Sequence, residues 1–464
     1  MGTGGGGLLT LLRAADASAE PLRLPPDLVG PLVAAPASAT VWPGRPTSLL
    51  TLGGAYPSPT LRARTGDVFE LRLENRLAES TNVHWHGLAA PADADGYPTD
   101  LVPPGGARQY RFQIAERAGT YWYHPHPDGR TAEQVYGGMA GFFIVEDDEE
   151  RALGLPAGDY DLPLLLQDRR STADGSFRYA PSPMDLMAGY LGDVVLVNGT
   201  PDAELAVAAT VYRFRLLNGS NARIFRVAFD DGRSFQVIAG DGGLLDSAIH
   251  TTECVLGPGE RVEMLVDFSG DAIGRSLRLV SLPFTARGGM GPGMGMGMGG
   301  ASAQGAGFAL LGVTIARPGP SAPTPGRLVP LQRLDPARVE VRRRFVMDMR
   351  MPPFAGSFTI NGRSFDPGRV DVRAERGAIE SWEVVNASTE PHPFHVHATQ
   401  FQVVRRSSGP LAVHETALKD TVLVWPGETV ELLLRFERHA GLYVLHCHNL
   451  EHEDAGMMLN LEVV

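Results

Sequence analysis

Cysteine is scarce in this chain of 464 residues, which contains only Cys254 and Cys447. At most one disulfide can form, so no disulfide framework holds the fold. No apolar run approaches the roughly 20 residues that span a bilayer, and we expect no membrane insertion. Basic residues are outnumbered, 41 against 53 acidic ones, and the net charge of −12 disfavours nucleic acid as a partner.

Helical periodicity is also scarce, whereas turn-forming residues are abundant. The chain has 55 glycines and 36 prolines, and short strand-like runs such as Val68 to Leu73 lie between turn signals. The sequence therefore predicts an all-β protein of many short strands. Its length favours two to four domains.

Two sequence patterns each occur three times at domain-sized spacing. The first, a turn and two strands ending in Asn, spans Gly54 to Asn75, Asn198 to Asn218 and Asn361 to Asn386. The second spans Pro103 to His126, Gly257 to Pro283 and Trp425 to His448. We predict three domains, 1–150, 151–325 and 326–464, with the second boundary in a Pro-rich stretch. Only the first and third copies end in histidines, so we expect the chemistry between those two domains.

Ten of the thirteen histidines fall in four clusters, His84-Trp85-His86, His124-Pro125-His126, His392-x-x-His395-x-His397 and His446-Cys447-His448-x-x-x-His452. Residues i and i+2 of a strand point to the same face about 6.5 to 7 Å apart, so each His-x-His pair can hold two adjacent metals. Eight imidazoles in such pairs are the right number for three metals with positions left open for oxygen species.

Cys447 lies between His446 and His448, and the same alternation sends its sulfur to the opposite face. One strand therefore serves two separate sites. On the sulfur side, His392 and His452 add two nitrogens, and Met457 adds a weak axial thioether, although Met458 competes for that role. Two nitrogens, a thiolate and a thioether are the signature of a blue-copper electron-transfer site.

These four motifs resemble those of the multicopper oxidases, in particular three-domain, laccase-like bacterial members, along essentially the whole chain. The resemblance implies three cupredoxin-like domains in tandem, each a Greek-key β-sandwich or barrel. It also implies four copper ions that couple one-electron oxidation of a substrate to reduction of O₂ to water. The implied ligands are His392, Cys447, His452 and Met457 for type 1 copper, His84 and His395 for type 2, and His86, His124, His448 and His126, His397, His446 for the two type 3 ions.

Two acidic residues resemble acids that the family places near its oxygen site. Asp95 matches the acid near type 2 copper, with a turn Asp before Gly as the alternative. Glu451 matches an acid that relays protons, with a solvated charge as the alternative. Reduction of O₂ to water consumes four protons, which motivates both assignments. Asp420 also matches a family motif, but a buried structural hydrogen bond explains it equally well.

The remaining histidines and the second cysteine lie outside the motifs. We expect His250, His414 and His439 to be surface or hydrogen-bonded residues, and Cys254 to be a free buried thiol. The N-terminal segment 1–21 has a short apolar patch but no basic n-region, and we interpret it as a tail or a trimmed export signal.

A low-complexity stretch, 290–299, alternates Met and Gly and cannot pack a core, which indicates a flexible surface loop. Its thioethers Met290, Met294, Met296 and Met298 are soft ligands that select Cu(I), and Met347, Met349 and Met351 could add to them.

Three functions are compatible with these features. The first is a laccase acting on phenols and aromatic amines, and the second is chiefly a cuprous oxidase. The third, a copper-binding scaffold, fits poorly because every implied ligand is present. By the resemblance we expect a monomeric protein in the periplasm or secreted.

Overall fold

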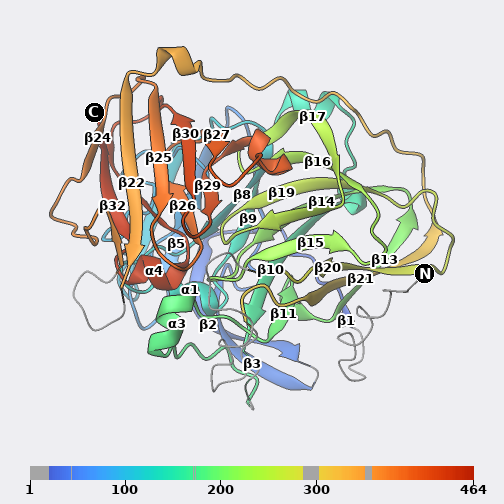
Figure 1. Ribbon diagram of the computed structural model, residues 1–464. Coiled ribbons are helices and arrows are strands. Elements are labelled where there is room, and N and C mark those ends of the chain that lie inside the picture. Colours follow the sequence, from blue (N-terminus) through green and yellow to red (C-terminus); the bar gives the residue numbers. More distant parts are fainter. Residues whose placement is uncertain (1–19, 43, 171, 173, 286–302, 351–357) are drawn as a thin grey trace, which may run out of the picture.

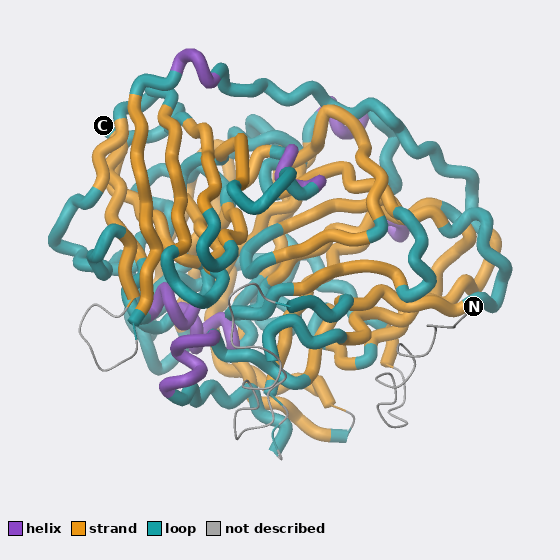
Figure 2. The backbone as a smooth tube through the Cα atoms, viewed as in Figure 1, coloured by secondary structure: helices purple, strands orange, loops and turns teal. Residues whose placement is uncertain are grey.

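The computed structural model describes residues 20–42, 44–170, 172, 174–285, 303–350 and 358–464. The N-terminal segment 1–19, the Met-rich stretch and Met351 lie outside the described residues. The all-β prediction is confirmed, because strands dominate the described chain and helices are short (Figure 2). No helix within these ranges is long and apolar enough to span a membrane.

Six sheets form three pairs along the chain. One sheet of the first pair consists, in spatial order, of β3 (Arg45–Leu52), β2 (Leu32–Trp42), β5 (Val68–Asn75) and β7 (Ala107–Gln113). The other sheet consists of β4 (Leu61–Arg64), β9 (Gly141–Glu146), β8 (Gly119–His124) and β6 (His84–His86).

One sheet of the middle pair consists, in spatial order, of β1 (Glu20–Pro21), β13 (Ala203–Ala209), β21 (Phe308–Pro318), β20 (Ser276–Ser281), β15 (Phe225–Phe229) and β18 (Glu253–Leu256). The other sheet consists of β12 (Thr200–Pro201), β11 (Val194–Val197), β10 (Asp161–Arg169), β14 (Val211–Asn218), β19 (Arg261–Asp267), β16 (Phe235–Gly240) and β17 (Gly243–Thr251). Apart from β1, the strands of this pair come from one continuous stretch of the chain.

One sheet of the third pair consists of β23 (Phe358–Ile360), β22 (Val341–Met349), β25 (Glu380–Asn386), β30 (Thr429–Leu434), β27 (Phe401–Arg406) and β28 (Leu418–Lys419). The other sheet consists of β24 (Val372–Ala374), β32 (Met458–Val463), β31 (Gly441–Cys447), β26 (His392–Val396) and β29 (Thr421–Val424). Figure 1 shows this pair, in orange to red, beside the green to yellow middle pair. The predicted boundaries near residues 150 and 325 fall between the pairs and remain a proposal.

Each pair of sheets encloses its own apolar core. Trp85 belongs to the first core, Phe214 to the middle one and Trp382 to the third, and all three side chains are fully buried. Met347 and Met349, two apart on β22, both face the third core. Their burial argues against the suggestion that they offer exposed thioethers to Cu(I).

The helices are α1 (Thr131–Tyr136), α2 (Asp148–Ala152), α3 (Pro183–Ala188) and α4 (Leu450–Asp454), with 3₁₀ turns η1 (Gly158–Tyr160), η2 (Pro336–Arg338) and η3 (Val413–Thr416). Helices α1 and α3 both contact α4, so three segments far apart in sequence meet at one place (Figure 1). This meeting point lies beside the strands that carry the clustered histidines.

The two repeated sequence patterns bind each other in all three copies. The asparagines that end the first pattern, Asn75, Asn218 and Asn386, are buried. Each side-chain amide donates to two main-chain carbonyl oxygens 2.7 to 2.9 Å away. Each main-chain N–H donates to the turn that opens the second pattern, at Gly106, Glu260 and Glu428. The two repeated patterns therefore form a recurrent contact, which we call the clasp, between two segments of each domain.

Strand burial distinguishes the outer sheets from those that carry the histidines. Along β5, every second residue is buried, as expected of a strand with one face toward solvent. In contrast, β6, β8 and β26 are buried at every position. One face of these strands packs into its own core, and the other faces a neighbouring domain.

Candidate metal centre

Strand pairing brings the four histidine clusters together at the junction of the first and third sheet pairs. On β6 and β8, His84 lies opposite His124. On β26 and β31, His395 lies opposite His446, and Phe394 lies opposite Cys447. The eight histidines that converge at this junction, which we call the histidine cluster, are His84, His86, His124, His126, His395, His397, His446 and His448.

Two histidines of the cluster approach each other from different domains. Nε2 of His84 lies 3.4 Å from Nε2 of His395. The Nδ1 atoms of both rings are held 2.8 Å from main-chain oxygens, of Asp95 and Asp420 respectively. These are the two residues predicted as type 2 ligands.

A second group consists of His126, His397 and His446. Nε2 of His446 lies 3.2 Å from Nε2 of His126 and 3.1 Å from Nε2 of His397. On the far side of the rings, Asp95 Oδ2 accepts from His397 Nδ1 at 2.7 Å. The group corresponds to one predicted type 3 set.

The third group consists of His86, His124 and His448. Nδ1 of His86 lies 3.4 Å from Nε2 of His124. The His448 ring centroid lies 4.9 Å from that of His86 and 5.3 Å from that of His124, and neither of its nitrogens has a hydrogen-bond partner among the described residues. This is the other predicted type 3 set.

The donor set fits metal ions. Burial lowers the pKa of His124 to about 3 and that of His126 to about 4, so both imidazoles are neutral at physiological pH. Because acceptor oxygens lie 2.7 to 3.5 Å from the outer nitrogens of the facing rings, the lone pairs of the inner nitrogens point at one another. Lone pairs 3.1 to 3.4 Å apart repel unless a cation lies between them.

On the other face of β31 lies the thiolate site, formed by His392, Cys447 and His452. Cys447 Sγ is 3.3 Å from His392 Nδ1 and 3.7 Å from His452 Nδ1. Helix α4 follows β31 after only two residues and thereby returns His452 over the sulfur. Burial raises the pKa of the Cys447 thiol, so a bound cation is needed to keep the thiolate at neutral pH.

Outer contacts fix both imidazoles of the thiolate site. Ser388 Oγ is 2.7 Å from His392 Nε2, and the carbonyl oxygen of Met187 accepts from His452 Nε2 at 3.0 Å. Met457 is fully buried and shares the core that contains Cys447. Met458 instead lies opposite His446 on the paired strand, hence on the histidine face, so the register favours Met457 as the axial thioether.

The known proteins that this chain resembles agree with a metal centre of this kind. Family models described as "Multicopper oxidase" match residues 35–150 and 336–464. Multicopper oxidase mco of Staphylococcus aureus is 31% identical over 424 residues, covering 90% of this chain and 85% of the relative. The chain belongs to the multicopper oxidase family. Copper is therefore its metal, and its activity is that of an oxidase.

Other multicopper oxidase relatives carry different names. A Bacillus stratosphericus laccase is 29% identical, covering 90% of this chain and 91% of the relative. The Escherichia coli cell division protein FtsP is 32% identical, covering 98% and 95%.

Solved structures confirm the cupredoxin-like fold class expected from the resemblance. McoA multicopper oxidase of Aquifex aeolicus superposes with a TM-score of 0.87 at 34% identity, covering 96% of this chain and all of that structure. A Campylobacter jejuni multicopper oxidase described as a metallo-oxidase gives 0.83 at 29% identity, covering 96% and 95%.

Of the two acids predicted for this multicopper oxidase, the structure brings one to the histidine cluster. Asp95 is buried behind His397 and His84, and its Oδ1 has no hydrogen-bond partner among the described residues. Glu451 faces elsewhere. Its carboxylate accepts from Asn221 Nδ2 at 2.8 Å and from the Tyr179 hydroxyl at 3.1 Å, so its predicted part in proton relay remains a prediction.

Glu453, two residues beyond Glu451 on α4, was not predicted from the sequence. Its buried carboxylate is 3.2 Å from His446 Nδ1 and 3.5 Å from His126 Nδ1. Burial opposes its charge, but these histidines hold its pKa well below the usual range. The spacing of two residues from the matched acid on a short helix was the only signal that could have pointed to it.

The remaining residues have structural contacts. Asp420 is fully buried and ion-paired with Arg261, with Oδ1 3.0 Å from His86 Nε2. His414 is buried, and its Nδ1 lies 3.3 Å from Sγ of the free, buried Cys254, as expected of a satisfied histidine. His250 is exposed and contacts Gln236.

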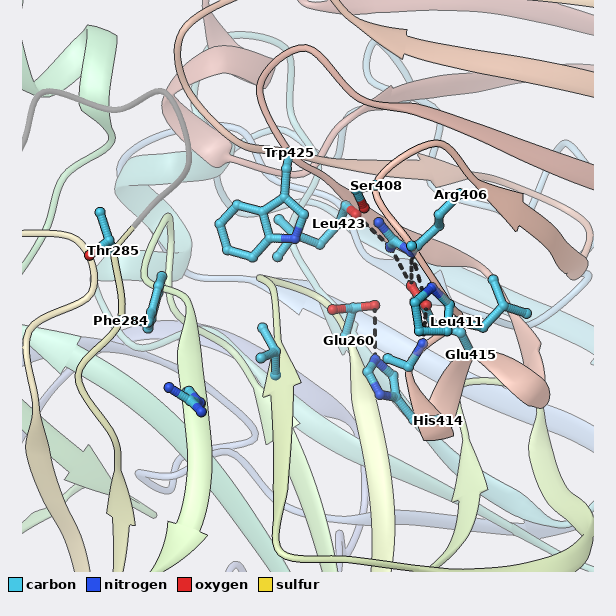
Figure 3. A pocket seen from close by; sticks show the side chains of 15 residues that line it. Glu260, Phe284, Thr285, Arg406, Ser408, Leu411, His414, Glu415, Leu423 and Trp425 are labelled. Atoms are coloured by element: carbon cyan, nitrogen blue, oxygen red, sulfur yellow. Dashed lines mark hydrogen bonds and ion pairs between the residues drawn. The ribbon is translucent and has the colours of Figure 1, made fainter.

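A cavity of about 360 Å³ opens between the middle and third sheet pairs. Figure 3 shows Glu260 and His414 on one side of it and Phe284 and Trp425 on another. None of the twelve predicted copper ligands lines it. The cavity is therefore separate from the metal centre.

Proposed function

We propose that this oxidase takes single electrons from phenols or aromatic amines at the thiolate site and delivers them to O₂ at the histidine cluster, forming water. The observation that carries the proposal is strand β31, on which Cys447 lies directly between His446 and His448 and so joins the two sites covalently. Copper, when bound, supplies the one-electron redox steps and the binding of O₂. We assign one type 1 ion to the thiolate site, one type 2 ion to His84 and His395, and two type 3 ions to the other six histidines.

Electrons enter past the residues that cover the thiolate site, because the His452 ring itself is fully buried. The Phe358 ring centroid lies 5.3 Å from that of His452, and the Met187 carbonyl contacts Nε2. A phenol needs only van der Waals contact with this cover to lie within a few ångströms of the ligand ring. Product radicals then leave without entering the protein.

Protons reach the histidine cluster through its own carboxylates, which take up protons from outside the cluster and pass them on. Glu453 Oε2 faces Nδ1 of His446, and Asp95 Oδ2 holds the proton of His397 Nδ1. Burial raises the pKa of Glu451, on the other side of α4, to about 7, so this carboxyl group takes up and releases protons near neutral pH. Four protons are consumed for each O₂, so a supply beside the cluster avoids charge build-up.

Cu(I) is the second candidate substrate. Helix α3 places Met187 against the core of the third pair, with its carbonyl on His452, and exposes Met184. Thioethers select Cu(I), and one structural neighbour is described as a metallo-oxidase. The Met-rich stretch 290–298 would add further ligands of the same kind.

A scaffold function, raised by the likeness to a cell division protein, is the least supported. All twelve predicted ligands are present and buried, which a protein without copper chemistry has no need to retain. We also propose that the protein is a monomer and that it acts outside the cytoplasm.

The visible spectrum of the copper-loaded protein tests both substrates. We expect a Cys447 charge-transfer band that bleaches anaerobically with a phenol and returns with O₂. The double variant Met184→Leu, Met187→Leu preserves side-chain volume and should slow bleaching by Cu(I) severalfold while leaving phenol rates unchanged. Bleaching by Cu(I) at the wild-type rate would remove these thioethers from the path, and a fully loaded protein without the band would refute the type 1 assignment.

A further inference from the structure

The middle sheet pair contributes no predicted copper ligand, yet one of its turns closes on the histidine cluster. This turn, 257–261, is the middle copy of the clasp that all three domains share. At Gly259 a Cβ atom would lie 3.2 Å from ring atoms of both His86 and His448. The turn backbone therefore packs directly against two histidines of the cluster.

Arg261 ends this turn and is fully buried. A guanidinium has five N–H donors, and all five have acceptors in this structure. Nε donates to Thr120 O at 3.0 Å, and the terminal nitrogens donate to Gly259 O at 2.9 Å and Asp241 O at 3.0 Å. The last two donors bind Asp420 in a bidentate pair of 2.7 and 2.5 Å. One side chain thus ties the first, middle and third sheet pairs together.

Asp420 transmits this anchoring to two histidines. Its Oδ1 accepts from His86 Nε2 at 3.0 Å, and its main-chain oxygen accepts from His395 Nδ1 at 2.8 Å. The first contact places the proton of His86 on Nε2, so the Nδ1 lone pair faces His124. Other rings of the cluster, such as His84 and His397, are held through Nδ1 instead. The orientation of His86 therefore depends on Asp420, together with the Thr421 hydroxyl, which lies 3.1 Å from the same nitrogen and donates to Asp420 Oδ1.

The Arg261–Asp420 pair is tightly packed, and no other side chain can replace the arginine in it. At Gly87, directly after His86, a Cβ atom would lie 2.6 Å from Asp420 Oδ2 and 2.7 Å from Arg261 Nη2. Lysine cannot replace the arginine, because an ammonium has three donors for five acceptors and cannot form the planar bidentate pair. Without the guanidinium, the Asp420 carboxylate keeps, among the described residues, only the Thr421 hydroxyl and His86 Nε2 as hydrogen-bond donors to its Oδ1, and Oδ2 loses its partner.

We propose that Arg261 is a positioning residue for the histidine cluster, which acts through Asp420 to hold His86 and His395 in the orientation that binds copper. The middle domain thereby controls a metal centre to which it gives no ligand. This inference rests on the proposed function, in which the cluster binds three of the copper ions.

Arg261→Lys in the full-length protein tests the inference, with Arg215→Lys as a matched control. Arg215 is also a buried arginine of the middle sheet pair, bound by Asp161 in a bidentate pair, by Glu263 and by Thr120 Oγ1, but no hydrogen bond or ion pair found for it reaches a histidine. Copper per chain, the electron paramagnetic resonance of type 2 copper and the near-ultraviolet absorption of the type 3 pair are measured together with the visible Cys447 band.

We expect Arg261→Lys to keep the Cys447 band but to bind copper at the cluster about 10- to 100-fold more weakly, with altered type 2 resonance. Arg215→Lys should leave all these signals at wild-type values. Cluster copper and resonance equal in the two variants would overturn the inference. A wild-type cluster that takes up no copper would instead refute the proposed function itself.

Asp420→Asn supplies a second test if Arg261→Lys does not fold. It keeps the shape of the side chain but removes the charge that Arg261 binds, and we expect the same cluster-specific loss. In the double variant Arg261→Gln, Asp420→Asn, the loss should not exceed that of the worse of the two single variants Arg261→Gln and Asp420→Asn, because the two residues act as a unit. Additive losses would contradict transmission through Asp420.

Discussion

The histidine cluster and the thiolate site lie on opposite faces of one strand, yet they are assembled differently. The cluster takes imidazoles from the first and third sheet pairs and its buried arginine from the middle one. The thiolate site takes Ser388 and its ligands from the third pair and only the Met187 carbonyl from elsewhere. One site therefore forms when domains pack, and the other forms with the fold of a single domain.

This contrast predicts that the two sites can be damaged separately. Changes at domain junctions should empty the cluster and spare the visible band, whereas changes inside the third pair should do the reverse. Substitutions that respect side-chain volume are the right tools, because the buried strands on either side tolerate little change in packing.

Cys447→Ser should give the largest effect. The variant loses the soft thiolate, so the visible band disappears and phenol oxidation falls to the background of the assay. The cluster histidines on the opposite face keep their contacts, and copper content should fall only from about four to about three ions per chain. Loss of all copper would show that the two sites do not form independently. Copper analysis and the type 2 resonance are the measurements.

Glu453→Gln should give the next largest effect, and it distinguishes the roles of the two faces of α4. Its carboxylate contacts two cluster histidines, so reoxidation by O₂ should slow on the order of 10²-fold while the Cys447 band stays intact. Glu451→Gln is the matched control from the same helix, and we expect it to slow reoxidation less. Stopped-flow mixing of the reduced enzyme with O₂ measures both, and a larger effect at Glu451 would show that the main proton role belongs to that residue instead.

Ser388→Ala should give the smallest effect, confined to the thiolate site. His392 Nε2 loses a 2.7 Å hydrogen bond, and copper affinity there should fall by about tenfold with a shifted visible band. Ser220 occupies the same place in the middle copy, but its hydroxyl has no partner among the described residues, so Ser220→Ala is the control. Copper titration against a chelator distinguishes the two, and equal affinities would mean that Ser388 does not orient His392.

The proposed metal ligands could be identified in the sequence because the His-x-His pairs follow the period of two of a strand and the four motifs resemble those of the multicopper oxidases. Cys447 lies between two histidines in the sequence, and side chains alternate along a strand. Its sulfur and the neighbouring imidazoles therefore lie on opposite faces. The clasp asparagines were visible as a repeat, but their hydrogen bonds were not.

Other parts of the site depend on contacts that no local pattern encodes. Glu451 and Glu453 lie on a helix, where a spacing of two residues turns side chains to different sides, so strand logic does not apply. Arg261 and Asp420 are 159 residues apart, and only the packing of domains brings them together. Met347 and Met349, which we expected could add to the thioethers of the Met-rich stretch, both lie on the core face of their strand because of its period of two.

The buried clasp of the middle domain also makes the histidine cluster depend on a single side-chain amide, that of Asn218. Asn218 precedes Gly219, the neighbour that least hinders hydrolysis of an asparagine amide to a carboxylate. Its Nδ2 now donates to the carbonyl oxygens of Arg223 and Leu256, and a carboxylate in that place would repel both. The adjoining turn carries Gly259 against His86 and His448. Hydrolysis of the Asn218 amide, in a residue that is not a predicted copper ligand, would therefore disturb the turn that packs against two histidines of the cluster.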